Sequence, residues 1–151
     1  MTGQVTVLAV RHADIDQPAA SADPPLNAAG RRRATALAHV AGSSAVGTIF
    51  TSTLTRTKAT AEPLAHRLGL QPREVPGTAE LAEQVRSGEL GEVVMIAGHS
   101  NTVPEMIHAL GVPSAPAIGE REFDNLFVVT VVVADGTAGL VRLRYGAIPT
   151  R

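Results

Sequence analysis

The chain has 151 residues, of which 44% are hydrophobic, 18% charged and 3% aromatic, and its formal net charge at pH 7 is -1. This length and composition are typical of a globular protein, and we expect one domain over residues 1–151. Because the chain is neither basic nor rich in aromatic residues, we expect no nucleic-acid partner. The absence of cysteine excludes disulfides, thiolate catalysis and cysteine-based zinc sites.

The first residues lead directly into an apolar segment, without the basic start and small-residue cleavage site of a signal peptide. No segment approaches the roughly 20 apolar residues that cross a bilayer. We therefore expect a cytoplasmic protein with no membrane partner.

Two kinds of hydrophobic pattern alternate along the first two thirds of the chain. Runs of Val, Ile, Leu and Phe predict strands at 5–10, 48–52 and 93–97. Apolar residues spaced i, i+3, i+4 and i+7 predict helices with one buried face over 34–41 and 61–68. Strands that alternate with helices predict right-handed crossovers and a mainly parallel sheet.

Within the second helical pattern, Pro63 lacks a backbone N–H and predicts a kink or a later start of the helix. Further along, residues 70–75 indicate a short edge strand, 78–86 a weak helix and 103–110 a better-defined one. Segments 16–25 and 111–119 are rich in Pro, Ala and Ser and predict surface loops.

The end of the chain has the pattern of a hairpin, with strands at 126–134 and 140–145 around Asp135 and Gly136. The expected fold class is therefore α/β. We expect a three-layer sandwich with a mainly parallel central sheet, helices on both faces and an antiparallel C-terminal hairpin.

Basic and histidine residues follow three of the predicted parallel strands. Arg11 and His12 come after the first strand, Arg56 after the second, and His99 and Ser100 after the strand at 93–97. The carboxyl ends of parallel strands meet at one edge, where open α/β sheets bind their ligands. Core packing gives no reason to bring two histidines and two arginines to that edge.

These side-chain types together indicate a phosphoryl site. Guanidinium groups match phosphate oxygens bidentately, while imidazole can attack phosphorus or hold an equatorial oxygen. The expected phosphate-binding set is Arg11, Arg56, His99 and Ser100.

His12 must be neutral to attack phosphorus, and the positive charges of Arg11 and Arg56 favour the neutral imidazole. Asn101 or Ser100 is expected to cap the following helix, which would direct free backbone N–H groups toward the anion.

Other polar residues have structural interpretations. Ser52 either contacts phosphate or ends a strand, Asn27 caps a helix, and Asn125 holds the loop before the hairpin. Arg31, Arg32 and Arg33 are expected to form a solvated helix face, and three further histidines to be surface or satisfied positions: His39, His66 and His108.

Several motifs, in order, resemble the signature of the histidine phosphatase (phosphoglycerate mutase-like) superfamily. They are Arg11-His12-Ala13, then 26–30, 51–56 running into Thr60-Ala61, and Gly98-His99-Ser100. Segments 124–129 and 144–146 are similar to a short bacterial subgroup of phosphatases.

The resemblance implies a phosphohistidine enzyme that needs no metal or other cofactor. It assigns His12 as the nucleophile, Arg11 and Arg56 as phosphate-binding residues, and His99 as the second histidine that stabilises the transferring group. The implied partner is a small phosphorylated substrate or a phosphoprotein.

The sequence departs from the family pattern at Ala13, where glycine is usual, and at Pro18, where many members place a phosphate-contacting asparagine. The usual proton donor is also missing, because residues 76–98 leave no room for a large insertion and Ser100 replaces the aspartate of phytase-type relatives. Four carboxylates remain as candidate donors: Asp14, Glu74, Glu80 and Asp124.

A general acid matters most for poor leaving groups and contributes roughly 10²–10⁴-fold. Its absence therefore favours phosphohistidine, acyl phosphate or aryl phosphate as the substrate. The alternative hypothesis is a non-catalytic domain that binds phosphorylated ligands with the same residues, although a sensor has no need of the nucleophile His12.

Overall fold

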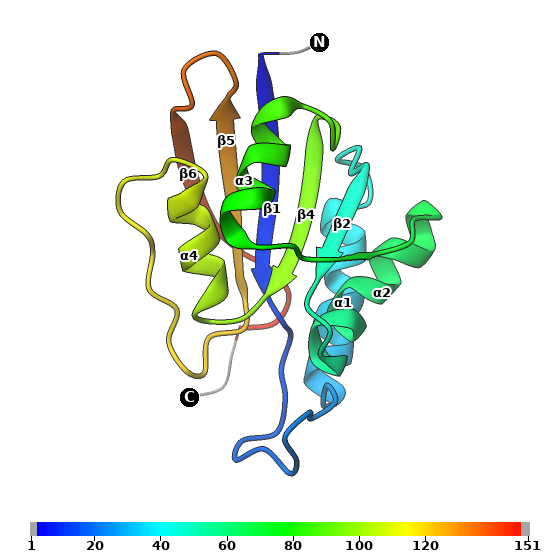
Figure 1. The fold of residues 1–151 in the computed structure, drawn as a ribbon. Coiled ribbons are helices and arrows are strands. Elements are labelled where there is room, and N and C mark those ends of the chain that lie inside the picture. The colour runs from blue at the N-terminus through cyan, green and yellow to red at the C-terminus, as the bar shows by residue number, and fades with distance from the viewer. Residues whose placement is uncertain (1–2, 149–151) are drawn as a thin grey trace.

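The computed structural model describes residues 3–148, which form a six-stranded sheet and four helices (Figure 1). In chain order the elements are β1 (Gln4–Arg11), α1 (Ala28–Ala41), β2 (Thr48–Thr51), α2 (Thr55–Leu68), β3 (Arg73–Glu74), α3 (Thr78–Ser87), β4 (Val93–Gly98), α4 (Thr102–Ala109), β5 (Asn125–Val132) and β6 (Ala138–Arg144). Among these residues, no helix combines the length and the apolar character needed to cross a bilayer.

The strand order is β3-β2-β4-β1-β5-β6, and the prediction of a mainly parallel sheet is confirmed. β3, β2, β4 and β1 pair in parallel, whereas β5 pairs antiparallel with β1 and β6 antiparallel with β5. Arg11 lies opposite Gly98, and Thr51 lies opposite Ala97. The segments that follow β1, β2 and β4 therefore leave the sheet at the same edge.

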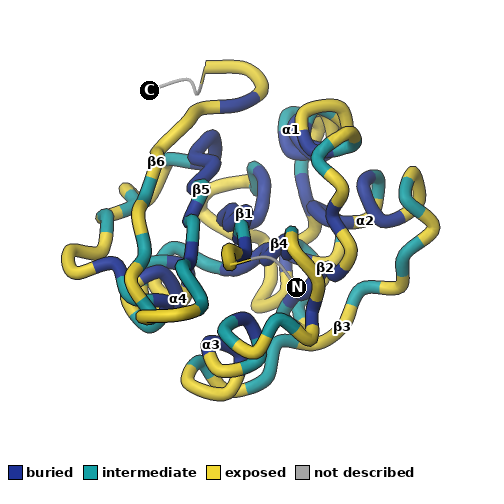
Figure 2. Tube along the Cα trace, turned by 90° about the horizontal axis from the view of Figure 1, so that it is seen from above, coloured by how far each residue is buried: buried dark blue, intermediate teal, exposed yellow. Residues whose placement is uncertain are grey.

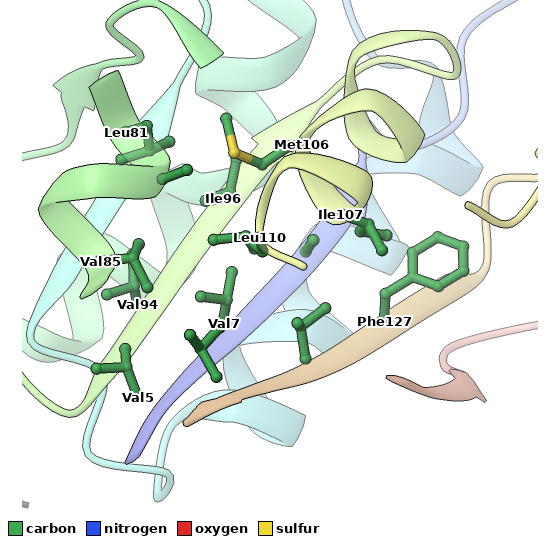
Figure 3. Close-up of a cluster of buried hydrophobic side chains, with 14 of the residues drawn as sticks. Val5, Val7, Leu81, Val85, Val94, Ile96, Met106, Ile107, Leu110 and Phe127 are labelled. Atoms are coloured by element: carbon green, nitrogen blue, oxygen red, sulfur yellow. The ribbon is translucent and has the colours of Figure 1, made fainter. Parts of the chain in front are cut away.

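The sheet lies between two helical layers, as expected for a three-layer sandwich. Seen from above, α1 and α2 cover one face, and α3 and α4 cover the other (Figure 2). Alternate residues of β1 serve the two cores: Val5 and Val7 belong to the α3/α4 side, whereas Leu8 and Val10 belong to the α1/α2 side. Figure 3 shows the α3/α4 core, with Val7, Ile96, Ile107 and Phe127 among its side chains.

Helix α2 corrects the expectation that Pro63 delays its start, because the helix begins at Thr55 and contains Pro63. The proline removes one backbone hydrogen bond, but the helix also buries Ala61, Leu64 and Ala65. Packing of a buried face supplies most of the stability of a helix in a protein, and here it outweighs the lost bond.

The edge strand β3 spans only Arg73–Glu74, which is shorter than the predicted 70–75. Both residues are exposed, and prolines stand at positions 72 and 76. Because proline cannot donate to the ladder, the pairing with β2 is confined to the short segment between them, where Arg73 and Glu74 pair with β2 and the Val75 N–H donates to the Thr51 oxygen at 2.9 Å.

Arg33 corrects the interpretation of the arginine triplet as a solvated face. Arg31 and Arg32 are exposed, but Arg33 is buried and its Nε donates to Asp14 Oδ1 at 2.6 Å. Its Nη1 donates to the backbone oxygens of Tyr145 and Ala147 at 2.7 and 2.9 Å. The triplet therefore contains one internal cross-link between α1, the segment after β1 and the end of the hairpin.

Candidate active site

His12 follows directly on β1 and is buried. Its backbone N–H donates to the Gly98 oxygen at 2.8 Å, and its ring Nδ1 lies 2.8 Å from the Ala13 oxygen. A carbonyl oxygen only accepts hydrogen bonds, so Nδ1 carries the proton. In the neutral ring this leaves the lone pair on Nε2, which is the form that can act as a nucleophile.

Ala13, which replaces the usual glycine, has an ordinary backbone conformation, because Ala45 is the single non-glycine residue with positive φ between residues 3 and 148. Its side chain is fully buried, and its N–H donates to Thr60 Oγ1 at 2.8 Å. The substitution is therefore accommodated without backbone strain.

His99 follows β4 and faces His12, with 5.5 Å between the ring centroids. Its Nε2 lies 2.8 Å from Ser52 Oγ, which in turn lies 2.6 Å from Thr57 Oγ1. Ser52 thus orients the imidazole of His99, a role that neither interpretation of this residue from the sequence included. The signal that was available is its position directly after β2, at the edge where β4 also ends.

Arg11 is the last residue of β1, and its guanidinium is held by the loop that precedes β5. Nη1 donates to the backbone oxygens of Gly119, Glu120 and Glu122 at 3.1, 2.9 and 3.0 Å. The guanidinium carbon also lies 4.2 Å from the ring centroid of Phe123.

Phe123 was not predicted from the sequence and contacts two of the candidate residues. Besides its position under Arg11, its ring centroid lies 5.8 Å from that of His12. It is buried and lies outside any regular element, so no hydrophobic period marked it.

Arg56 lies in the first turn of α2 and is half-buried. Its Nη1 is 3.9 Å from Oδ1 of Asp23, which comes from the loop over 16–25. The same carboxylate accepts from the backbone N–H and the hydroxyl of Thr55 at 2.9 and 2.7 Å. Asp23 therefore caps α2 from outside the helix, whose own N-cap, Leu54, has no side chain that can do so.

The electrostatics favour two neutral imidazoles beside two cations. Burial lowers the pKa of His12 to about 4, and the charges of Arg11 and Arg56 add to this effect, whereas the hydrogen bond to Ala13 opposes it. Burial, followed by the charges of Arg56 and Arg11, also lowers the pKa of His99. Both rings are therefore neutral at pH 7, and the two guanidinium groups provide the positive charge.

Three guanidinium nitrogens among the described residues are buried without a hydrogen-bond acceptor: Arg11 Nε, Arg56 Nε and Arg56 Nη1. Buried donors are nearly always paired, so these atoms are suited to an acidic oxygen supplied by a ligand.

The expected capping of α4 by Asn101 or Ser100 is wrong. Asn101 has a helical backbone and its side chain makes no capping hydrogen bond. Instead, Thr102 Oγ1 accepts from the backbone N–H of His99 at 3.0 Å. Ser100, which was expected to bind phosphate, is half-buried in the turn between His99 and α4.

The four candidate proton donors lie in different environments. Asp14 makes two hydrogen bonds with Arg33, and Asp124 accepts from Arg144 at 3.1 Å. Glu74 on β3 and Glu80 on α3 are exposed. The two aspartates are thus engaged in structural ion pairs.

The remaining polar residues have structural or surface positions. His39, His66 and His108 are exposed, as expected, and Asn27 caps α1 by accepting from the Gly30 N–H at 2.9 Å. Asn125 donates to Glu122 at 3.1 Å and so holds the loop before the hairpin. Within residues 3–148, no three His, Asp or Glu side chains are grouped so that they could hold a metal ion.

Residues 7–90 match the family model described as histidine phosphatase superfamily (branch 1). This match covers more than half of the chain and includes His12, Arg11 and Arg56. No curated protein sequence matches the chain.

Solved structures resemble the fold over nearly its whole length. One is the protein histidine phosphatase SixA complexed with tungstate, at a TM-score of 0.77 and 18% identity, covering 93% of this chain and 97% of that one. Another is a mycobacterial glucosyl-3-phosphoglycerate phosphatase, at a TM-score of 0.73 and 19% identity, covering 97% and 100%.

Proposed function

Because the chain belongs to the histidine phosphatase superfamily, we propose that it hydrolyses a phosphomonoester or a phosphoramidate such as phosphohistidine, with His12 as the nucleophile. The observation that carries the proposal is the pairing of two neutral imidazoles, 5.5 Å apart, with two guanidinium groups close enough to lower the pKa of both rings.

In the first step, Nε2 of His12 attacks phosphorus while the bond from phosphorus to the leaving oxygen or nitrogen breaks, and that atom takes the bonding electron pair. The phosphoryl group is then covalently bound to His12. Nδ1 remains protonated throughout, because the Ala13 oxygen accepts its hydrogen.

In the second step, water attacks the phosphorus of phosphohistidine, releases inorganic phosphate and returns the electron pair to Nε2. Arg11 and Arg56 neutralise charge on the phosphoryl oxygens in both steps, and His99 and Ser100 complete the binding set. Neither step calls for a metal ion or another cofactor.

The ion pairs of the two aspartates favour a substrate that needs little acid catalysis. Asp14 and Asp124 are paired with arginines, so neither is free to carry a proton to a leaving group. The groups released from phosphohistidine, acyl phosphates and aryl phosphates need less of that help, whereas an alkoxide leaves slowly without it.

Two structural neighbours support an oxyanion site on this fold. One is a phosphatase in complex with tungstate, a tetrahedral oxyanion, and the other is a phosphatase of glucosyl-3-phosphoglycerate, a phosphorylated compound. The buried nitrogens of Arg11 and Arg56 that lack a hydrogen-bond acceptor are suited to a ligand of the same shape and charge.

A His12→Asn variant tests the nucleophile. We expect its turnover of phenyl phosphate to fall to the uncatalysed background, because the amide cannot accept the phosphoryl group. Quenching the wild type in alkali during turnover and measuring the intact mass should reveal one acid-labile phosphoryl adduct, which the variant lacks.

The exposed His39 supplies the matched control, since His39→Asn should retain both turnover and adduct. Turnover by His12→Asn at the wild-type rate would refute the mechanism. If the wild type bound phosphate with neither adduct nor turnover, the alternative of a non-catalytic phosphoanion-binding domain would be correct.

A further inference from the structure

A small apolar cavity of about 210 Å³ adjoins the candidate active site on the α3/α4 side of the sheet. Ser52 and His99, which are hydrogen-bonded to each other, lie at its edge, and Thr78 and Thr102 are its other polar lining residues. Its apolar wall includes Val75, Ile96, Val103 and Met106. Cavity and site therefore share the imidazole of His99.

The lining of this cavity contains no Asp, Glu, Lys or Arg among the described residues. The one titratable group is His99, whose pKa is lowered by burial and by the two arginines. An ionised group that entered would lose its hydration without gaining a partner of opposite charge, which is strongly unfavourable. The cavity thus selects uncharged groups.

The volume also restricts the occupant. Apolar cavities of about 150 Å³ are large enough to hold benzene, so 210 Å³ accommodates one ring and little more. Val75 and the connection to α3 form one side, while Met106, Val103 and Ile96 belong to the core cluster of Figure 3. A thioether such as that of Met106 makes favourable contacts with an aromatic edge.

We propose that this cavity binds the leaving group of the substrate, and that the leaving group is a single planar, uncharged ring attached to the phosphoryl group. The inference rests on the proposed function, because the ring is placed beside a phosphoryl group held at His12 and His99. It agrees independently with the weak acid catalysis expected here, since ring-bound oxygen or nitrogen is a better leaving atom than an alkoxide.

A second cavity, of about 530 Å³, offers the competing location. It lies between α2 and β3, also reaches Ser52, and has a charged lining that includes Lys58, Glu62 and Arg73. It does not include His99 among its lining residues. A substrate held there would carry a polar or ionised leaving group, so the two cavities predict opposite preferences.

Phosphonates that cannot be hydrolysed measure binding without turnover. We expect phenylphosphonate to bind about tenfold or more tightly than methylphosphonate, because it buries one ring. 4-Carboxyphenylphosphonate should lose most of that advantage. Equal affinities for phenyl- and methylphosphonate, or tightest binding of the carboxylated ring, would overturn the proposal.

Thr78 provides a matched pair of variants within the cavity lining. It is the first residue of α3, where an acidic side chain suits the helix dipole, but its hydroxyl also lies 3.5 Å from Glu105 Oε1, so circular dichroism of Thr78→Asp accompanies the binding measurement to show that the variant is folded. We expect Thr78→Asp to bring the ratio of phenyl- to methylphosphonate affinity close to one, while the nearly isosteric Thr78→Val retains it. The ratio removes any general repulsion between the new carboxylate and the phosphonate.

Kinetics separate this proposal from the proposed function. Phenyl phosphate and acetyl phosphate report the hydrolytic step, and phosphohistidine peptide compares a nitrogen-linked ring with an oxygen-linked one. Turnover of all three with no phenylphosphonate preference would overturn the ring subsite alone. A normal preference with no turnover would leave the subsite standing and overturn the hydrolase.

Discussion

At the scale of single residues, the backbone around His12 determines what its ring can do. The Ala13 oxygen holds the proton on Nδ1, and the ring of Phe123 packs 5.8 Å away between centroids. Burial then disfavours the charged form more strongly than any single neighbour. The tautomer and the neutral state required for attack are therefore present before substrate binds.

The pKa of His12 can be tested directly. Because it is lowered from 6.5 to about 4, the ring stays neutral as the pH falls through 6.5 and becomes protonated only near pH 4. An NMR titration of the histidine rings should show this midpoint, with the signal assigned by its loss in His12→Asn. kcat/KM, corrected for ionisation of the substrate, should fall on the acid side of the same value.

Phe123→Ala should expose the His12 ring to water and move its titration midpoint upward toward 6.5, since desolvation is the largest cause of the lowered pKa. Val40→Ala, at an exposed position of α1, should leave the midpoint unchanged. A wild-type midpoint already near 6.5 would contradict the account.

At the scale of elements, α1 illustrates how a helix is seated close to the site. Asn27 caps its first turn, and Gly30 in that turn packs against the backbone of Asp14. A Cβ at Gly30 would collide with the Asp14 carbonyl oxygen, so only glycine allows the helix to approach the segment after β1 this closely.

Gly30→Ala should therefore destabilise the protein, by roughly 1–3 kcal/mol as is typical of overpacking, even though alanine is the better helix former. The free energy of unfolding in urea measures the loss. Gly47→Ala is the matched control, because the nearest atom to its new Cβ is the Leu90 oxygen at 4.0 Å. Equal stabilities of the two variants would show that α1 can move away from Asp14 at no cost.

At the scale of the whole molecule, Arg33 joins parts of the chain that are far apart in the sequence. It connects α1 to Asp14, two residues after His12, and to the backbone that follows β6. Arg11 binds the loop at 119–122 in the same way. Two buried arginines therefore connect the segments near the active-site edge of the sheet to parts of the chain about 100 residues away.

Arg33→Met should be strongly destabilising, by about 3–5 kcal/mol, because it removes one partner of a buried ion pair and leaves Asp14 uncompensated. Arg32→Met, at the exposed neighbour, should change the stability little. Urea unfolding of both variants makes the comparison. A small loss in Arg33→Met would indicate that Asp14 finds water or another partner.

The layered α/β architecture and the candidate active-site residues could be predicted from the amino-acid sequence. Hydrophobic periods reveal strands and helices, and parallel strands bring the residues after β1, β2 and β4 to one edge. Arg11, His12, Arg56 and His99 could be named for this reason. Their roles in catalysis stay predictions until the variants are measured.

The side chains that support those four residues could not be predicted from the sequence and are seen in the folded chain. These supporting contacts all join segments that are distant in the sequence. They are the hydrogen bond of Ser52 to His99, the capping of α2 by Asp23, the packing of Phe123 beside His12 and the ion pair of buried Arg33. A periodic pattern reports which face of its own element is buried. It carries no information on which polar group of another segment will lie next to a given side chain. The partners of the active-site residues are therefore seen only in the folded chain.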